Sequence, residues 1–439
     1  MFRRKIESIF LQWKSQKNHN PLIVKGCRQC GKTFSVCEFA KRNYKNVVYL
    51  NFFENPEYAQ FFAESLDVDT IVMYISAALG DKAVFESGET CLIFDEIQDC
   101  PQARTALKFF KLDGRYDVIG TGSLLGVNGY KNDVRSIPVG YETIVDMYPL
   151  DFEEFLWANG ITSQITDELR KCLQELKPVP TPIHNRMHEL LLQYCVVGGM
   201  PKVVETFMET RQMNNVLAVQ RNIVNGYKDD MVKYSETPYK SNIRECFESI
   251  PRQLSKENKK FKYSTVKKGA RSSQYLGALQ WIEDAGIIKR CYNLSITELP
   301  LDGNALQDVF KVYMCDTGLL VSMLEEGTQS DILHGNLLGY KGAIFENLVA
   351  DMFIKKGRKL YYFHKDSGLE IDFVFRYKGE CTLLEVKAQT GNTKSSKTIL
   401  AHPEKYHVYK CIKLGNYNVG TTGSTTTLPL YMGWLLDEV

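Results

Sequence analysis

A glycine-bounded loop between an apolar run and a helical pattern constrains this chain more than any other feature. The loop is GCRQCGKT, Gly26 to Thr33, and the apolar run before it is Leu22 to Val24. A strand, a loop of the form G-x-x-x-x-G-K-T and a helix together form the phosphate-binding loop (P-loop) of nucleotide-binding proteins. The helix N-terminus presents free N–H groups to the anion. The segment therefore predicts a nucleotide site beside a parallel sheet.

The loop residues have expected contacts with the nucleotide. Lys32 would reach the β- and γ-phosphates, and the Thr33 hydroxyl would hold Mg²⁺. Gly26 and Gly31 would let the backbone approach the phosphates closely. ATP and Mg²⁺ are thus the expected cofactors. The other residues expected to line the nucleotide are Cys27, Arg28, Gln29, Cys30 and Phe34.

Two acids follow a second apolar run, Cys91 to Phe94. An acid at the carboxyl end of a parallel strand lies beside the first loop of a doubly wound sheet. Asp95 is predicted to bind Mg²⁺ through water, and Glu96 to act as base or orienter for the attacking water. A third strand ends in Thr121-Gly122-Ser123, where a hydroxyl of Thr121 or Ser123 would contact the γ-phosphate or the water; a plain strand-to-loop turn is the alternative. Strands that alternate with helices predict a parallel α/β sheet.

The loop also contains Cys27-x-x-Cys30, the spacing of a redox pair or of half a zinc site. No second cysteine pair in the sequence completes a tetrahedral zinc site, so we interpret both cysteines as loop residues. Cys30 precedes a helix N-terminus, which lowers the pKa of a thiol. We therefore expect thiol modification at this position to block ATP binding.

Charge and apolar runs limit the remaining classes of protein. The 439 residues include 54 basic and 52 acidic side chains, so the net charge of +2 gives no whole-chain argument for nucleic acid or membrane. The N-terminal residues predict an amphipathic helix and not a signal peptide, and no run approaches 18 apolar residues. Twelve cysteines form no framework. These features predict a cytoplasmic chain with reduced thiols and no membrane partner.

The middle of the chain is expected to be helical over residues 156–240, with a break at Gly198-Gly199. Residues 241–330 predict a winged helix with a basic loop before its second helix. Eleven basic and five acidic residues lie between Arg244 and Arg290, and seven of the eleven lie within 256–271. Such a cluster neutralises phosphates, so DNA is a candidate partner of this segment. A solvated loop and a protein-binding winged helix are the alternatives.

Residues 331–439 carry a second candidate site. Glu385 and Lys387 are two residues apart in a predicted strand and therefore share a face, with Asp372 on the neighbouring strand. Glu346, in the helix before, would complete a shell of carboxylates around a second divalent metal, Mg²⁺ or Mn²⁺. The lysine would orient water or steady a scissile phosphate. A solvent-facing hairpin of alternating charge, or the same fold used only for binding, are the alternatives.

The strings GCRQCGKT, LIFDEIQDCP, IGTGSLLG and MYPLDFEEFLWANG resemble the AAA-type ATPase family whose members carry a C-terminal domain of unknown function, DUF4143. The last segment resembles the PD-(D/E)xK nuclease fold, with Asp372, Glu385 and Lys387 in the motif positions. In many relatives an arginine follows a glycine before the YPL segment. Here that place is Gly140-Tyr141, and Arg135 is the nearest candidate. Some P-loop ATPases take this arginine from a neighbouring subunit, so both a monomer and a homo-oligomer stay open.

The expected fold class is α/β. The predicted order is a P-loop AAA-type ATPase domain (1–155), a helical lid or linker (156–240), a winged-helix-like domain (241–330) and a small nuclease-like domain (331–439). The first function hypothesis is a Mg²⁺-dependent ATPase coupled to DNA binding, with metal-dependent DNA cleavage at its end. The alternative is a nucleotide-dependent regulatory or scaffold protein whose nuclease-like domain only binds a partner. A DNA-binding switch with slow ATP turnover is a third.

Overall fold

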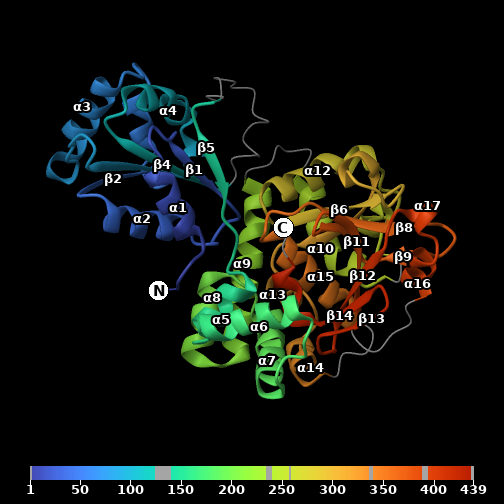
Figure 1. Cartoon of the computed structure of the whole chain (residues 1–439). Helices are drawn as coiled ribbons and strands as arrows, with labels where there is room; N and C mark the ends of the chain where they lie inside the picture. Colours follow the sequence, from blue (N-terminus) through green and yellow to red (C-terminus); the bar gives the residue numbers. More distant parts are fainter. Residues whose placement is uncertain are drawn as a thin grey trace. The chain divides into compact units, whose positions relative to one another are not determined.

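The computed structural model describes residues 2–123, 140–233, 240–256, 259–335, 340–387 and 394–436. The chain forms two compact units (Figure 1). The N-terminal unit contains Arg4–Pro149 and Asp284–Gly286, and the C-terminal unit contains the rest. In these described ranges, no helix has the length and apolar character that crossing a membrane requires.

The N-terminal unit is built on one five-stranded parallel sheet of order β2-β3-β4-β1-β5 (Figure 1). Parallel neighbours require connections that cross back over the sheet, which is the doubly wound arrangement expected from the alternation of strands and helices. The α/β class predicted from the sequence is therefore confirmed. The strands are β1 Leu22–Lys25, β2 Asn46–Asn51, β3 Thr90–Asp95, β4 Asp117–Gly122 and β5 Thr143–Asp146.

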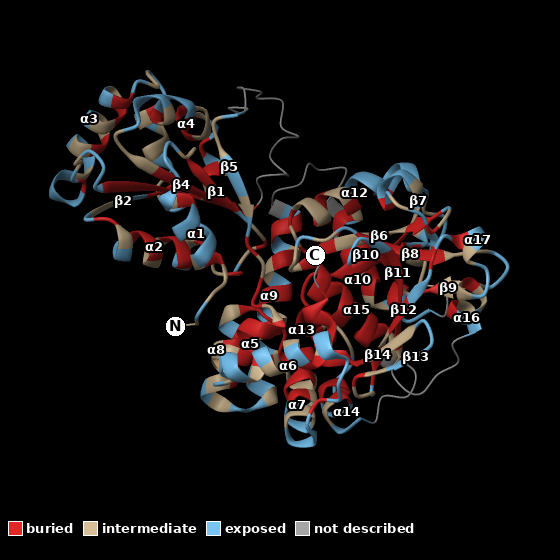
Figure 2. Cartoon of the chain, viewed as in Figure 1, coloured by how far each residue is buried: buried red, intermediate tan, exposed pale blue. Residues whose placement is uncertain are grey.

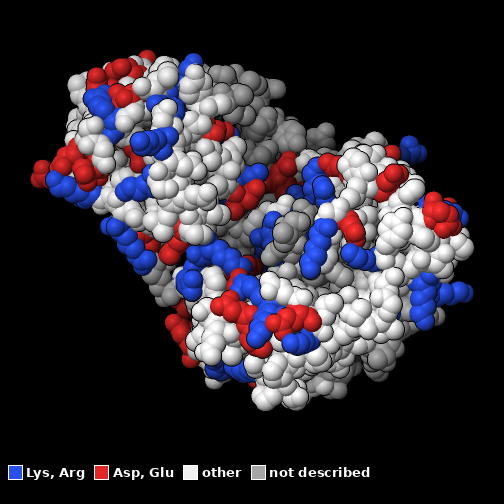
Figure 3. Space-filling view, viewed as in Figure 1, with Lys and Arg blue, Asp and Glu red and all other residues white. Residues whose placement is uncertain are grey.

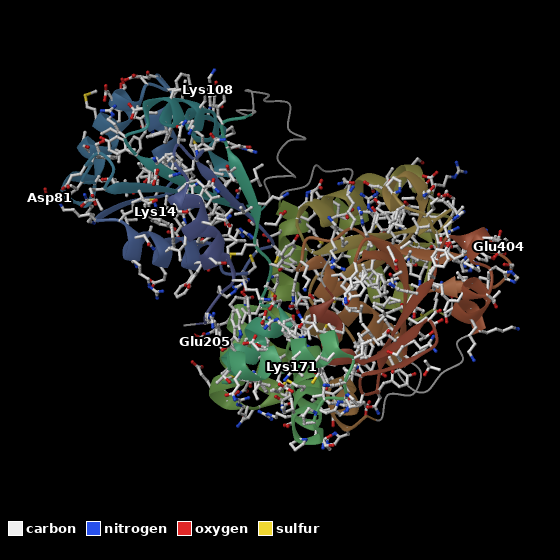
Figure 4. The ribbon with its side chains drawn as sticks, in the orientation of Figure 1. Lys14, Asp81, Lys108, Lys171, Glu205 and Glu404 are labelled. Atoms are coloured by element: carbon white, nitrogen blue, oxygen red, sulfur yellow. The ribbon has the colours of Figure 1, made fainter. Side chains whose placement is uncertain are left out.

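Helices bury both faces of this sheet. Along β3, Leu92 and Phe94 belong to one apolar cluster and Ile93 to the other, so the strand is buried on both sides. The neighbouring strands β1 and β4 are likewise largely buried (Figure 2). This explains why β3 is continuously apolar in sequence. Lys14, labelled in Figure 4, lies with its ammonium 3.6 Å from the centre of the Tyr44 ring and joins the first two helices. The helices are α1 Ile6–Ser15, α2 Lys32–Asn43, α3 Val68–Leu79 and α4 Pro101–Asp113, with short 3₁₀ turns at Pro56–Phe62, Gly80–Lys82 and Ile97–Asp99.

The C-terminal unit begins with helices that pack around a buried polar network. Asp316 accepts a 2.7 Å hydrogen bond from the Gly199 amide, and Lys355 lies 2.7 Å from Asp351 and 2.8 Å from the Tyr194 hydroxyl. The Lys355 and Asp351 side chains are at most 1% exposed, so each charge depends on its partner. The helices are α5 Phe152–Ala158, α6 Ser163–Glu175, α7 Thr181–Val197, α8 Pro201–Thr210, α9 Met213–Lys233, α10 Lys240–Leu254, α11 Tyr263–Val266, α12 Ser272–Asp284, α13 Thr317–Ser322, α14 Thr328–His334, α15 Lys341–Ile354, α16 Lys394–Leu400 and α17 Pro403–Tyr406.

Two sheets complete this unit, a four-stranded sheet of order β7-β6-β8-β9 and a five-stranded sheet of order β10-β11-β12-β14-β13. β6 and β7 form the antiparallel pair expected as a wing, but β6 also pairs in parallel with β8. The expected boundary at residue 330 therefore runs through one sheet. The strands are β6 Ile288–Leu294, β7 Ala305–Met314, β8 Leu360–His364, β9 Glu370–Ile371, β10 Phe373–Tyr377, β11 Glu380–Lys387, β12 Lys410–Gly415, β13 Gly420–Thr422 and β14 Thr425–Pro429.

Candidate functional site

The P-loop connects β1 to α2 in the N-terminal unit. Gln29 and Gly31 have φ angles of 63° and 98°, which turn the chain so that α2 begins at Lys32. The Lys32 ammonium donates to the carbonyl oxygens of Gly26 at 3.1 Å and Cys27 at 3.0 Å. The lysine thus folds back over its own loop. Phosphate oxygens would replace these carbonyls as partners when a nucleotide binds.

Asp95, at the end of β3, accepts hydrogen bonds from several side chains around the P-loop. Its carboxylate accepts from the Thr33 hydroxyl at 2.9 Å, from the Tyr49 hydroxyl at 2.7 Å and from the Asn51 amide at 3.2 Å, and also from the Thr121 hydroxyl. The side chain is almost fully buried. Four donors fix its orientation toward the P-loop, and the Thr33 and Asp95 oxygens together provide the hard donors that Mg²⁺ prefers.

Glu96 follows directly and has a left-handed backbone with φ of 52° and ψ of 47°. Such a conformation is costly for a residue with a side chain and is often retained at functional sites. Its Oε2 atom accepts from the Gln98 amide at 2.5 Å and from the Ser123 hydroxyl at 3.1 Å. The two donors hold the carboxylate on the P-loop side of the sheet edge.

A cavity of about 430 Å³ lies in front of these residues. It is lined by Arg28, Gln29, Gly31, Lys32, Thr33, Phe34 and Glu96. The Phe34 ring is 55% exposed, and Arg28 stacks over the Phe53 ring at 5.9 Å. Polar side chains and an exposed aromatic ring therefore line the same cavity. This combination suits a nucleotide, which has a phosphate chain and an aromatic ring system.

Cys27 and Cys30 lie beneath the loop and not in the cavity. Their side chains are 5% and 0% exposed. The Cys30 thiol lies 3.4 Å from the Met147 carbonyl oxygen, to which it donates, and is also hydrogen-bonded to the Cys27 thiol. The hydrogen bond with Cys27, together with the charges of Lys32 and Arg4, outweighs burial and lowers the pKa of Cys30 to about 6. The pKa of Cys30 is thus shifted in the direction expected from its place before a helix.

Most of the predicted residues of the nucleotide site thus lie together in one unit, but Cys27 and Cys30, which were also expected to line the nucleotide, do not line the cavity. Arg135, the candidate arginine, lies outside the described residues, so its role stays a prediction. Sequence analysis did not name Tyr49 or Asn51 as site residues, and it considered the Thr121 hydroxyl as a contact of the γ-phosphate or the water and not of Asp95. It also did not name Gln98 as the partner of Glu96, although Gln98 follows Glu96 by only two residues. Tyr49, Asn51 and Thr121 become neighbours of Asp95 through the strand order β2-β3-β4.

The second candidate site, in the C-terminal unit, is centred on Glu346 of α15. Its side chain is 3% exposed, and its Oε2 atom lies 2.7 Å from the Lys259 ammonium and 3.2 Å from the Tyr313 hydroxyl. The Lys311 ammonium of β7 lies 3.8 Å from Oε1 and 3.0 Å from Glu370. Burial alone would raise the pKa of Glu346, but the two lysines lower it to about 2. Neither lysine was predicted as a site residue.

Asp372, Glu385 and Lys387 lie around this cluster. Asp372 separates β9 from β10, and its Oδ2 atom accepts from the Val386 amide at 2.8 Å. The Lys387 ammonium is 3.3 Å from Glu385 Oε2, so the two side chains share one face of β11. Burial and the charge of Glu346 raise the pKa of Asp372 to about 8. The acids are therefore charge-balanced by lysines or by protonation.

We tested whether these acids fit a second metal ion. Among the residues that the structure describes, no three Asp, Glu, His or Cys side chains are arranged to hold one. Glu385 Oε2 accepts no hydrogen bond from any described residue, but it faces the Lys387 ammonium. Glu346 faces Lys259 and Lys311 in place of a vacant ligand position. The donor set in this arrangement does not fit a divalent ion, and the second metal remains unsupported.

The basic segment 256–271 is less available than its sequence suggests. Lys259 points inward to Glu346, and Lys267 pairs with Glu245 at 3.0 Å. Lys268 and Arg271 are exposed just before α12, whose first turn also exposes Ser272, Ser273 and Gln274. On the face shown in Figure 3, basic and acidic side chains are interspersed. Lys268 and Arg271 are thus two of the exposed basic residues of this segment, which also exposes Lys256 and Lys262.

Comparison with protein families identifies three consecutive segments. Residues 18–156 match a family model described as an AAA domain, residues 188–330 match a domain of unknown function, DUF8612, and residues 341–431 match a domain of unknown function, DUF4143. The first and last matches confirm the resemblance to AAA-type ATPases with a C-terminal DUF4143 domain.

Individual relatives are distant. An uncharacterized protein of Haemophilus influenzae is 24% identical over 190 residues, which is 42% of this chain and 40% of that protein. A Walker-type ATPase of Pyrococcus abyssi is 15% identical, with a TM-score of 0.42 over 74% of this chain and 96% of that chain. The ORC1 protein of Aeropyrum pernix, solved in complex with DNA, is 12% identical, with a TM-score of 0.30 over 76% of this chain and 93% of that chain.

Proposed function

We propose that this AAA-type ATPase with a C-terminal DUF4143 domain hydrolyses ATP and couples its nucleotide state to DNA binding. The observation that carries the first part is the convergence of Lys32, Thr33, Asp95 and Glu96 at one sheet edge. A protein that only binds ATP would need no more than the P-loop and its lysine. The oriented Glu96 carboxylate adds a group that handles the attacking water.

The proposed roles follow from the contacts. Lys32 leaves the Gly26 and Cys27 carbonyls to neutralise the phosphates. Glu96, held by Ser123, orients the water and receives its proton. Bound Mg²⁺, held by Thr33 and through water by Asp95, would neutralise charge between the β- and γ-phosphates.

The test compares two variants with wild type. Lys32→Ala is expected to lose both ATP binding and turnover. Glu96→Gln is expected to bind ATP normally and to hydrolyse it about 10²–10⁴-fold more slowly, the usual contribution of a general base. Binding is measured with a fluorescent nucleotide and turnover by phosphate release. Equal loss of binding and hydrolysis in Glu96→Gln would make Glu96 structural, and unchanged turnover in Lys32→Ala would overturn the site.

The DNA part of the proposal is supported by Lys268 and Arg271 at the start of α12. Removing two phosphate contacts should lower the slope of log affinity against log salt by about 1.8 for duplex DNA, since each contact contributes about 0.9. Lys268→Ala with Arg271→Ala is the test pair. Lys202→Ala on α8, which removes a surface lysine paired with Glu205, is the matched control (Figure 4 labels Glu205). An equal slope in all three proteins would remove this segment from DNA binding.

For the DUF4143 domain we propose partner binding without cleavage. The observation in favour is the occupation of Glu346 by Lys259 and Lys311. Incubation with single- and double-stranded DNA in Mg²⁺ or Mn²⁺, with and without ATP, should leave the DNA intact. Cleavage that is lost in both Asp372→Ala and Lys387→Ala would instead establish the nuclease hypothesis.

A further inference from the structure

The paired cysteines of the P-loop have no role in ATP hydrolysis as proposed above. Thr33, Lys32 and the loop amides handle the phosphates, whereas Cys27 and Cys30 point beneath the loop. Buried thiols usually serve as small apolar side chains. These two differ because they contact each other inside the four-residue stretch that must wrap the phosphates.

We propose that Cys27 and Cys30 form a redox modification site, in which a hydroperoxide converts the dithiol to a disulfide and thereby closes the P-loop to ATP. The proposal rests on the nucleotide site proposed above. The thiols are hydrogen-bonded to each other, and the loop turns between them at Gln29, whose φ is 63°. Positive groups surround Cys30, because Lys32 and Arg4 both act on it and Arg4 donates to its carbonyl oxygen at 3.2 Å.

The chemistry balances with one hydroperoxide. The Cys30 thiolate attacks a peroxide oxygen, the O–O bond breaks, and the departing hydroxide takes up a proton to give water and a sulfenic acid. The Cys27 sulfur then attacks the Cys30 sulfur, the S–O bond breaks, and the second hydroxide leaves as water with the Cys27 proton. Two electrons pass from the thiols to the peroxide. Lys32 and Arg4 stabilise the thiolate that begins the sequence.

The disulfide would change the loop where Lys32 is anchored. A disulfide needs its sulfurs at about 2.05 Å, well inside the distance of a thiol hydrogen bond, so residues 27–30 must contract. The Cys27 carbonyl, which binds the Lys32 ammonium, moves with them. Gly26 cannot relieve the change, because its Cα faces the Met147 carbonyl so closely that even a Cβ there would lie 2.1 Å from that oxygen. The loop amides and Lys32 would therefore lose the arrangement that phosphates require.

Burial decides which oxidants can react. Cys30 is 0% exposed, so a bulky maleimide should react slowly, whereas hydrogen peroxide is small enough to enter during brief opening of the loop. MgATP, bound over the loop, should protect both thiols. Cys37 on α2 is the matched comparison, because burial raises the pKa of its thiol to about 11 and it has no cysteine partner in the loop.

The experiment treats the full chain with hydrogen peroxide and maps disulfides by mass spectrometry. Tryptic peptides 26–28 and 29–32 should stay joined, and affinity for a fluorescent MgATP analogue should fall at least tenfold and return with dithiothreitol. The oxidation rate should rise up to about pH 6–7 and then level off, since the Cys30 pKa is about 6 and the thiolate reacts. An ordinary thiol would continue to gain reactivity through pH 9.

Two variants make the result decisive. Cys27→Ala with Cys30→Val should bind MgATP after peroxide as before it, while Cys37→Ser should respond like wild type. Absence of the joined peptides, or a disulfide that leaves MgATP affinity unchanged, would overturn the proposal, as would equal inactivation of the double variant. Failure of the reduced protein to bind MgATP would instead overturn the proposed function and leave the disulfide measurement standing.

Discussion

Replacing Lys311 by methionine should destabilise the C-terminal unit strongly. The ammonium group lies 3.0 Å from Glu370 and 3.8 Å from Glu346, and its side chain is 1% exposed. Methionine keeps most of the volume and removes the charge, so the nearby carboxylates lose a buried cation. Removing one partner of a buried ion pair costs about 3–5 kcal/mol. In domains of 150–250 residues, 1 kcal/mol shifts the melting temperature by about 2–4 °C.

The lower end of that range applies to a unit of this size, so the expected fall is about 6–10 °C. Differential scanning calorimetry would measure it on the full chain with saturating MgATP. Lys289→Met is the matched control, because Lys289 also lies on the four-stranded sheet and pairs with Glu283, but its side chain is 42% exposed. The control should change the melting temperature by about 1 °C or less, since exposed pairs contribute little.

Adding Mn²⁺ tests whether the acids around Glu346 are neutralised by lysines or bind a metal ion. With the lysines in place, 1 mM Mn²⁺ should leave the melting temperature of the C-terminal unit unchanged in wild type. Lys311→Met combined with Glu370→Gln should recover part of the lost stability, because both members of the 3.0 Å pair are then neutral while Glu346 keeps Lys259. A Lys311→Met variant as stable as wild type would refute the reasoning. So would a Mn²⁺-induced stabilisation of wild type that disappears in Asp372→Asn.

Two further changes test the framework around the sites. Gly199→Ala should prevent stable folding of the C-terminal unit, because the new Cβ would lie 1.9 Å from the Leu150 carbonyl oxygen. The control Gly226→Ala, on a helix with open space around it, should be neutral or slightly stabilising. Similar melting temperatures for the two variants would contradict this prediction. The hydrogen bond to Asp117 raises the pKa of His19, so the folded N-terminal unit binds this proton more tightly than the unfolded chain does. Its unfolding free energy should therefore fall as pH rises through the raised pKa of His19, and urea titrations at pH 6 and pH 8 should show a smaller difference in His19→Gln.

The residues of the candidate nucleotide site could be proposed from the sequence because their signals are local. The P-loop, its strand and its helix lie in one continuous segment, and the Asp95-Glu96 pair ends a single apolar strand. The hydrogen-bond partners of Asp95 lie on other strands and have no such local signal. Tyr49 is one of 24 tyrosines, and only the pairing of β2 with β3 brings its hydroxyl to the carboxylate. Strand order depends on packing across the whole sheet, so a linear pattern cannot specify it.

At the second candidate site, too, the sequence predicts what depends on one strand and does not predict what depends on how strands pair. Period-two spacing correctly places Glu385 and Lys387 on one face, because that spacing is a property of the strand itself. Lys311 lies between Phe310 and Val312 in a strand whose sequence predicts only a wing. Nothing in that strand indicates a charge that must be buried. Its role becomes visible only in the fold, where β6 pairs with β8 and the expected wing becomes part of the four-stranded sheet.

The positive charges around Glu346 determine whether the Asp372, Glu385 and Lys387 motif can bind a metal ion. A divalent ion would bring two positive charges to Glu346 and its neighbours, and Lys259 and Lys311 together bring the same two charges. The lysines are covalently part of the fold, so they need no loss of translational freedom to reach the acids, whereas an ion must be captured from solution. An incoming metal would have to displace at least one ammonium group and leave it without its buried carboxylate partner, which is unfavourable. The same acids with an apolar residue at position 311 would lack this competitor and would favour the metal.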